Sequence, residues 1–115
     1  MTVTILHNPR CSKSRATLAL LQERGVNPQI TLYLDSPPEA KELRSILKKL
    51  GLKPRELLRR GEPEYHALGL ENTGLGDDEL IEAMVTHPRL IERPIVLASH
   101  KAAIGRPPQA VLDIL

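Results

Sequence analysis

Residues 3–15 have the sequence VTILHNPRCSKSR, in which a short β-branched run is followed by a polar loop that contains Cys11. If a helix begins at Ser12, the cysteine lies at its N-terminus. There, free N–H groups and the helix dipole favour a negative charge on sulfur. The pattern therefore predicts a strand over 3–7, a helix over 12–24 and a reactive thiolate between them.

The surroundings of Cys11 favour a chemical role. It is the only cysteine in the chain, and a lone cysteine is often a small buried hydrophobe, but Asn, Pro, Arg, Ser and Lys neighbours favour a nucleophile. His7 and Arg15 could add positive charge or hydrogen bonds that lower the pKa of this thiol. His7 suits a purely structural hydrogen bond equally well. The Ser14 hydroxyl could donate to the sulfur, but we favour a role in satisfying backbone groups.

Length and composition limit the function. The 115 residues predict one domain over 1–115. One cysteine forms no internal disulfide, and no Cys/His cluster has the spacing of a metal site, so we expect a cytoplasmic protein without bound metal. No apolar run approaches the length of a membrane span. A net charge of +2, two Tyr and no Phe or Trp make nucleic-acid binding a weak hypothesis.

The rest of the chain predicts an α/β fold. Ser36-Pro37-Pro38-Glu39 has the pattern of a capping box with proline at the first helical position, and it predicts a helix that ends at Gly51. A turn at Arg59-Arg60-Gly61 should expose both arginines. Further strands are predicted over 29–33, 94–98 and 102–104, and further helices over 53–58, 77–85 and 107–112. This order predicts a mixed sheet covered by helices, with the first two strands parallel.

Four short motifs are spaced along the chain: His7-Asn8-Pro9-x-Cys11-x-x-Ser14-Arg15, Leu57-Leu58-Arg59, Arg93-Pro94-Ile95-Val96 and Gly105-Arg106-Pro107. Together with segments 33–38 and 111–115, they resemble the glutaredoxin-linked arsenate reductases. The likeness covers nearly the whole chain. It implies a thioredoxin-like fold, a mixed β-sheet flanked by helices, with an inserted helical region between the second and third strands.

The resemblance also implies the roles of site residues. Cys11 is then the nucleophile, and Arg59, Arg93 and Arg106 surround an arsenate oxyanion. Guanidinium groups match tetrahedral oxyanions bidentately, which agrees with this assignment. Arg60 directly follows Arg59, so the neighbour could make the contact instead; we favour Arg59 because it follows Leu57-Leu58. We expect a cis peptide bond at Pro94, beside the cysteine.

Two other classes of cysteine enzyme fit the sequence less well. A phosphatase loop requires C-x5-R, but Thr17 stands six residues after Cys11, and the C-x-x-C of ordinary thioredoxins is replaced by Cys11-Ser12-Lys13-Ser14. The resemblance instead implies reduction of As(V) to As(III) through an adduct on Cys11. Glutathione is then the co-substrate and glutaredoxin the partner of an expected monomer without a bound cofactor. The alternative is a related redox regulator that binds RNA polymerase, although such regulators typically carry C-x-x-C.

Overall fold

The computed structural model describes residues 2–115, and the chain divides into two compact units. The first unit combines the N-terminal part, up to Ser36, with Arg93–Leu115, and the second comprises Pro37–Glu92. The expectation of a single domain over 1–115 stays a prediction.

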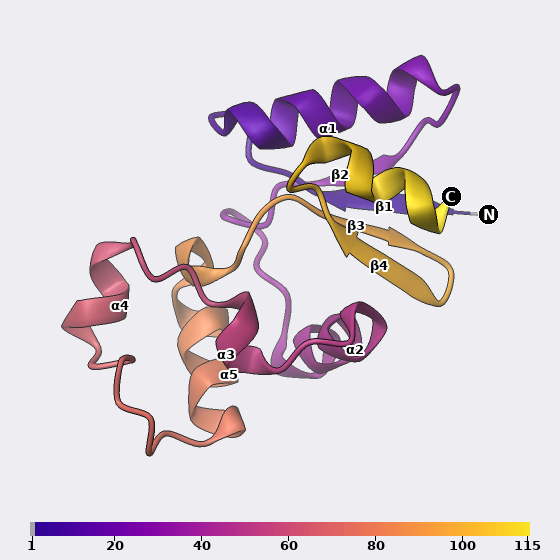
Figure 1. Ribbon diagram of the computed structural model, residues 1–115. Coiled ribbons are helices and arrows are strands. Elements are labelled where there is room, and N and C mark those ends of the chain that lie inside the picture. Colours follow the sequence, from indigo (N-terminus) through magenta and orange to yellow (C-terminus); the bar gives the residue numbers. More distant parts are fainter. Residues whose placement is uncertain (1) are drawn as a thin grey trace. The chain divides into compact units, whose positions relative to one another are not determined.

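The first unit contains a mixed four-stranded sheet with the order β2-β1-β3-β4 (Figure 1). Its strands are β1 (Val3–Leu6), β2 (Gln29–Thr31), β3 (Ile95–Ala98) and β4 (Lys101–Ile104). The helix α1 (Ser12–Glu23) connects β1 to β2, and these two strands pair in parallel, as predicted. Strand β3 pairs antiparallel with both β1 and β4. The predicted fold class is therefore confirmed.

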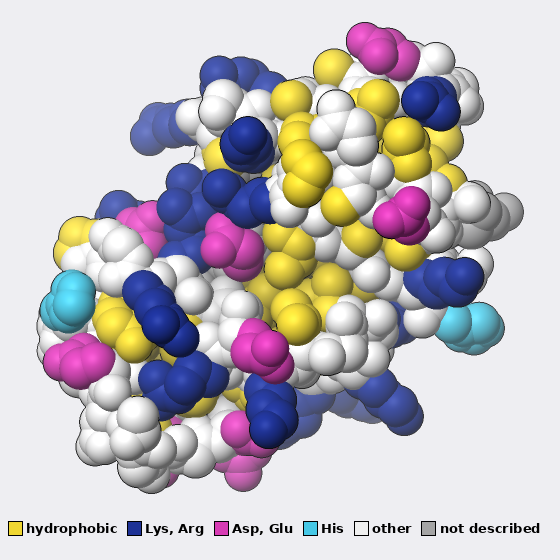
Figure 2. Space-filling view, in the orientation of Figure 1, with side chains coloured by type: hydrophobic (Ala, Val, Ile, Leu, Met, Phe, Trp, Pro, Cys, Tyr) yellow, Lys and Arg dark blue, Asp and Glu magenta, His cyan; other side chains and the backbone are white. Residues whose placement is uncertain are grey.

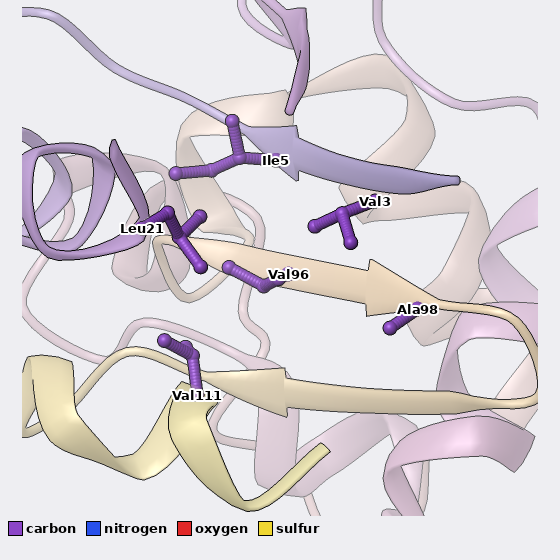
Figure 3. Close-up of a cluster of buried hydrophobic side chains, with 6 residues drawn as sticks. All are labelled: Val3, Ile5, Leu21, Val96, Ala98 and Val111. Carbon is purple, nitrogen blue, oxygen red and sulfur yellow. The ribbon is translucent and has the colours of Figure 1, made fainter. Parts of the chain in front are cut away.

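One face of this sheet packs against α1 and the C-terminal segment. In the antiparallel register, Val3 lies opposite Ala98, and Ile5 lies opposite Val96. Side chains alternate along a strand, so these four point to the same face. The buried cluster that they form is completed by Leu21 of α1 and Val111 of the 3-10 helix η2 (Pro108–Ile114) (Figure 3). This packing holds α1, and so the loop before it, against the sheet.

Two predicted helices differ from those observed. The second helix, α2 (Ala40–Leu50), begins after Glu39 rather than at Ser36. The physical reason is that Pro38 forces the preceding Pro37 out of helical backbone angles, so the helix starts only beyond the pair. The backbone N–H of Glu39 donates to the carboxylate of Glu42 instead (3.4 Å). The closing helix, predicted over 107–112, is the 3-10 helix η2 and runs over Pro108–Ile114.

The second unit is helical, and it contains the predicted insertion between β2 and β3. Its elements are α2, α3 (Pro54–Leu57), α4 (Pro63–Ala67), α5 (Asp77–Thr86) and the 3-10 helix η1 (Pro88–Leu90). The buried side chains lie on one face of each helix: Leu43, Ile46 and Leu47 on α2, and Leu80, Ile81 and Met84 on α5. Gly51 ends α2 with a φ of +70°, which glycine adopts without steric cost.

The surface of the described residues carries charges of both signs. Figure 2 shows Lys and Arg side chains interspersed with Asp and Glu side chains on the face in view. Among the large apolar side chains, Ile30, Leu32 and Leu34 are exposed at β2 and just after it. In residues 2–115, no helix has both the length and the apolar character needed to cross a membrane.

Candidate active site

Cys11 is the residue that caps the N-terminus of α1. Its backbone is extended (φ −95°, ψ 123°), and its carbonyl accepts a hydrogen bond from the N–H of Arg15 (3.0 Å). Its own N–H donates to the carbonyl of Asn8 (3.0 Å). The residue is buried, and the backbone N–H groups of Lys13 and Ser14 hydrogen-bond to its sulfur. The predicted strand, loop and helix, with the cysteine at the helix N-terminus, are confirmed.

A buried hydrogen-bond network stabilises the loop that carries Cys11. The Oγ of Ser14 accepts a hydrogen bond from the N–H of Asn8 (3.0 Å) and lies 2.6 Å from Nδ1 of His7. Burial, with a smaller effect from the charge of Arg15, lowers the pKa of His7. In a neutral His7, Nδ1 accepts a hydrogen bond from the Ser14 hydroxyl, and we assign that tautomer because it satisfies both groups. Ser14 thus hydrogen-bonds to both the loop backbone and His7, and the supporting roles of these two residues in the reaction stay predictions.

Asn8 is a contributor that the sequence did not single out. Its side-chain oxygen accepts a hydrogen bond from the N–H of Arg10 (3.0 Å), which holds the turn that leads to Cys11. An asparagine before Pro9 is typical of a turn of this kind, so the signal was present in the sequence.

Two arginines distant in sequence lie beside the sulfur of Cys11. Nη2 of Arg106 is 3.9 Å from Sγ, and Nε of the same side chain donates to the carbonyl of Arg93 (2.7 Å). The side chain of Arg93 also hydrogen-bonds to the thiolate. The sheet explains this convergence. Ile95 pairs with both Leu6 and Ile104, so the residues that flank these strand ends lie at one edge of the sheet.

These groups favour the thiolate form of Cys11. Burial raises the pKa of the thiol, but the hydrogen bond and charge of Arg93 and the N–H groups of Ser14 and Lys13 lower it further than burial raises it. The resulting pKa lies below that of a free thiol. In residues 2–115, no three His, Cys, Asp or Glu side chains are grouped to hold a metal ion. The donors around Sγ are instead N–H and guanidinium groups, which suit an anion.

The β3–β4 hairpin packs closely against α1 near the site. The Arg93–Pro94 peptide bond is cis, as predicted, and the Arg106–Pro107 bond is cis as well. The N–H of Gly105 donates to the carbonyl of Pro94 (2.9 Å). A Cβ on Gly105 would lie 2.8 Å from Cγ of Pro94 and would collide with Oγ1 of Thr17. Gly105 thus packs closely against Thr17 and Pro94, although nothing local in the sequence indicates this contact.

Arg15 hydrogen-bonds to the backbone of the cysteine loop, and it is not among the groups that shift the pKa of Cys11. Its Nη1 donates to the carbonyl of Pro9 (2.9 Å), and its charge acts on the pKa of His7. A supporting role of Arg15 in the reaction stays a prediction.

Arg59 belongs to the second unit. Its N–H donates to the carbonyl of Leu90 (2.8 Å), and its side chain forms ion pairs with Glu62 and Glu92, each at 3.3 Å. These contacts leave Arg59 half-buried, whereas Arg60 is exposed. The prediction that the turn exposes both arginines is therefore wrong for Arg59. Its membership of an oxyanion site stays a prediction.

Fold and site together define a thioredoxin-like protein with one activated cysteine beside two arginines. Residues 6–114 match the model of the ArsC family, and the chain belongs to that family. It is 51% identical to an arsenate reductase of Haemophilus influenzae over the full length of both chains. It is 54% identical to the uncharacterized protein YfgD of Escherichia coli, over 98% of this chain and 96% of that protein. The structure of an arsenate reductase from Vibrio cholerae superimposes with a TM-score of 0.98 at 49% identity, covering 100% of this chain and 98% of that one.

Proposed function

We propose that this protein is an arsenate reductase, which reduces As(V) to As(III) through a covalent adduct on Cys11. The observation that carries the proposal is the position of this thiol, at a helix N-terminus and beside the guanidinium groups of Arg93 and Arg106. A thiolate is a strong nucleophile, and cationic donors next to it favour an oxyanion substrate. Relatives named arsenate reductase, which are 50% and 51% identical to this chain over nearly its whole length, support the same assignment.

The first chemical step is attack of the Cys11 thiolate on arsenic. Arg93 and Arg106 neutralise charge on the arsenate oxygens, and one arsenate hydroxyl takes up a proton from solvent and leaves as water. By the family resemblance, we propose Arg59 as a third arginine that binds arsenate; within the second unit its guanidinium group pairs with Glu62 and Glu92. His7, Ser14 and Pro94 support the loop and the strand end that carry these groups.

The second half of the reaction uses an external reductant. Because Cys11 is the sole cysteine, the chain has no second thiol that could form an internal disulfide with it and so release arsenite. We propose glutathione as the co-substrate and glutaredoxin as the protein that removes glutathione from Cys11. The enzyme then acts as a cytoplasmic monomer without a bound cofactor.

A steady-state assay tests this function. Purified protein is incubated with arsenate, glutathione and glutaredoxin, and NADPH consumption is followed through glutathione reductase. We expect turnover that saturates with arsenate and is absent in Cys11→Ser. A protein whose Cys11 is alkylated rapidly at neutral pH, but which gives no arsenate-dependent NADPH consumption, would contradict the proposal.

A further inference from the structure

A pocket of about 300 Å³ lies beside the cysteine loop, within the first unit. Its lining residues come from the segments that follow β1 and β2: His7, Asn8, Pro9, Arg10, Leu32, Leu34 and Asp35. Because these two strands are parallel, both segments lie at the edge of the sheet where the strands' carboxyl ends meet. Open α/β sheets bind ligands at this edge, and the volume is at the lower end of the range for small-molecule sites.

The two walls of this pocket carry opposite charges. Arg10 comes from the cysteine loop, and Asp35 follows β2; both are exposed. The backbone N–H of each donates a hydrogen bond, to Asn8 and Leu32 respectively. In the part of the chain that the structure describes, neither the guanidinium group of Arg10 nor the carboxylate of Asp35 has a hydrogen bond or an ion pair. A small ligand that carries both a carboxylate and an ammonium group matches this pair.

The pocket is lined in part by the loop that carries the nucleophile. Arg10 precedes Cys11 in the chain, and the N–H of Cys11 donates to the carbonyl of Asn8, another lining residue. A ligand seated between Arg10 and Asp35 would therefore contact the loop that positions the thiol, as well as the segment after β2. We propose that this pocket binds the zwitterionic peptide thiol that reduces the adduct, with Arg10 on a carboxylate and Asp35 on the ammonium group. The inference rests on the proposed function, because it assigns a place to the reductant of that reaction.

The step that binding at this pocket promotes is a two-electron transfer. The sulfur of the peptide thiol, as its thiolate, attacks Sγ of the Cys11–arsenic adduct, and a sulfur–sulfur bond forms. The arsenic–sulfur bond breaks, and its electron pair stays on arsenic, which is reduced from As(V) to As(III). Both sulfur atoms are oxidised to the disulfide level, and a second external thiol then exchanges with the mixed disulfide and frees Cys11.

The pocket can be tested without arsenate. The Cys11 thiolate attacks glutathione disulfide, which gives the same Cys11–glutathione disulfide and releases one glutathione. Rate constants measured by intact mass for this reaction are compared with those for 2-hydroxyethyl disulfide, which is neutral. We expect Arg10→Gln and Asp35→Asn each to slow the reaction with glutathione disulfide about tenfold, and to change the reaction with the neutral disulfide less than about twofold. Arg24→Gln and Glu23→Gln, at the other end of α1, are the matched controls and should leave both rates unchanged.

The Asp35→Asn variant distinguishes specific binding of the ammonium group from long-range electrostatic attraction of glutathione disulfide. Glutathione disulfide is an anion, so simple electrostatics predicts that removal of a carboxylate accelerates the reaction, whereas recognition of the ammonium group predicts that it slows. Acceleration by Asp35→Asn, or equal slowing of both disulfides by Arg10→Gln, would overturn the inference. The outcomes also distinguish it from the proposed function. A protein that shows this discrimination but no arsenate turnover supports the pocket and removes the arsenate reductase assignment.

Discussion

The guanidinium group of Arg106 lies 3.9 Å from the sulfur of Cys11, although the two residues are 95 positions apart in the chain. The β3–β4 hairpin makes this possible. Arg106 follows β4 just after Ile104, which pairs with Ile95 of β3, and Ile95 also pairs with Leu6 at the end of β1. The same arrangement brings the side chain of Arg93 to the thiol. The environment of the nucleophile is thus built by the sheet and not by the cysteine loop alone.

The pKa of Cys11 should lie below the free-thiol value of about 8.5 and should depend on Arg93. The Arg93 side chain hydrogen-bonds to the thiolate, and both this bond and its charge lower the pKa. Arg93→Gln should therefore raise the pKa, whereas Arg24→Gln should not. The rate of iodoacetamide alkylation against pH measures it. An unchanged pH profile in Arg93→Gln would exclude this arginine as a cause.

His7 should make folding stability depend on pH. Its pKa in the folded protein is below 6.5, so the unfolded chain binds the proton more readily. Its contribution to stability is complete above about pH 6.5 and is lost as the pH falls through the folded-state pKa. His7→Gln should remove this part of the pH dependence. Urea unfolding at pH 7.5 and pH 5.5 checks it, and the loss of unfolding free energy between the two should be smaller in the variant than in the wild type.

Replacing the site arginines with lysine should impair arsenate reduction. Lysine keeps the charge but lacks the planar fork that binds an oxyanion bidentately. For Arg93→Lys and Arg106→Lys we expect turnover to fall about 10²–10³-fold, as for loss of a donor to a transition-state oxyanion.

The pair Arg59→Lys and Arg60→Lys tests the choice within the doublet. Arg59→Lys should lower turnover and Arg60→Lys should not, while circular dichroism shows both variants folded. If only the Arg60 variant lost activity, the assignment would pass to Arg60. If neither variant did, the doublet would contribute nothing to oxyanion binding.

Gly105→Ala should destabilise the first unit. The added Cβ would lie 2.8 Å from Cγ of Pro94 and would collide with Oγ1 of the fully buried Thr17. Overpacking of this kind costs about 1–3 kcal/mol. Gly61→Ala is the matched control, because a Cβ there meets nothing within 4 Å. Thermal unfolding compares the two, and equal melting temperatures would show that the hairpin moves aside without cost.

The parts of the fold that were predicted correctly depend on local patterns. The β-branched run, the polar loop and the helix around Cys11 are adjacent in sequence. The capping pattern at Ser36 predicts a start for α2 that is too early, because Pro38 keeps Pro37 out of helical backbone angles.

The parts of the site that could not be predicted depend on contacts between distant segments. Arg59 is half-buried because a bridge between Leu58 and Ile91 brings it next to Glu92, and nothing near Arg59 indicates that pairing. The meeting of Gly105 with Thr17 is of the same kind. Arg93 and Arg106 were identified through a family resemblance, because the hairpin register that joins them has no local signature.

Turnover should depend on an external thiol, because Cys11 is the only cysteine and cannot form a disulfide within the chain. Incubation with arsenate and glutathione, without glutaredoxin, should give at most one adduct or one glutathione per protein, visible by intact mass. Addition of glutaredoxin should restore multiple turnover, and Cys11→Ser should show neither species. Sustained turnover with no thiol present would defeat the mechanism. Reduction of As(V) needs two electrons, and one cysteine cannot supply them and return unchanged.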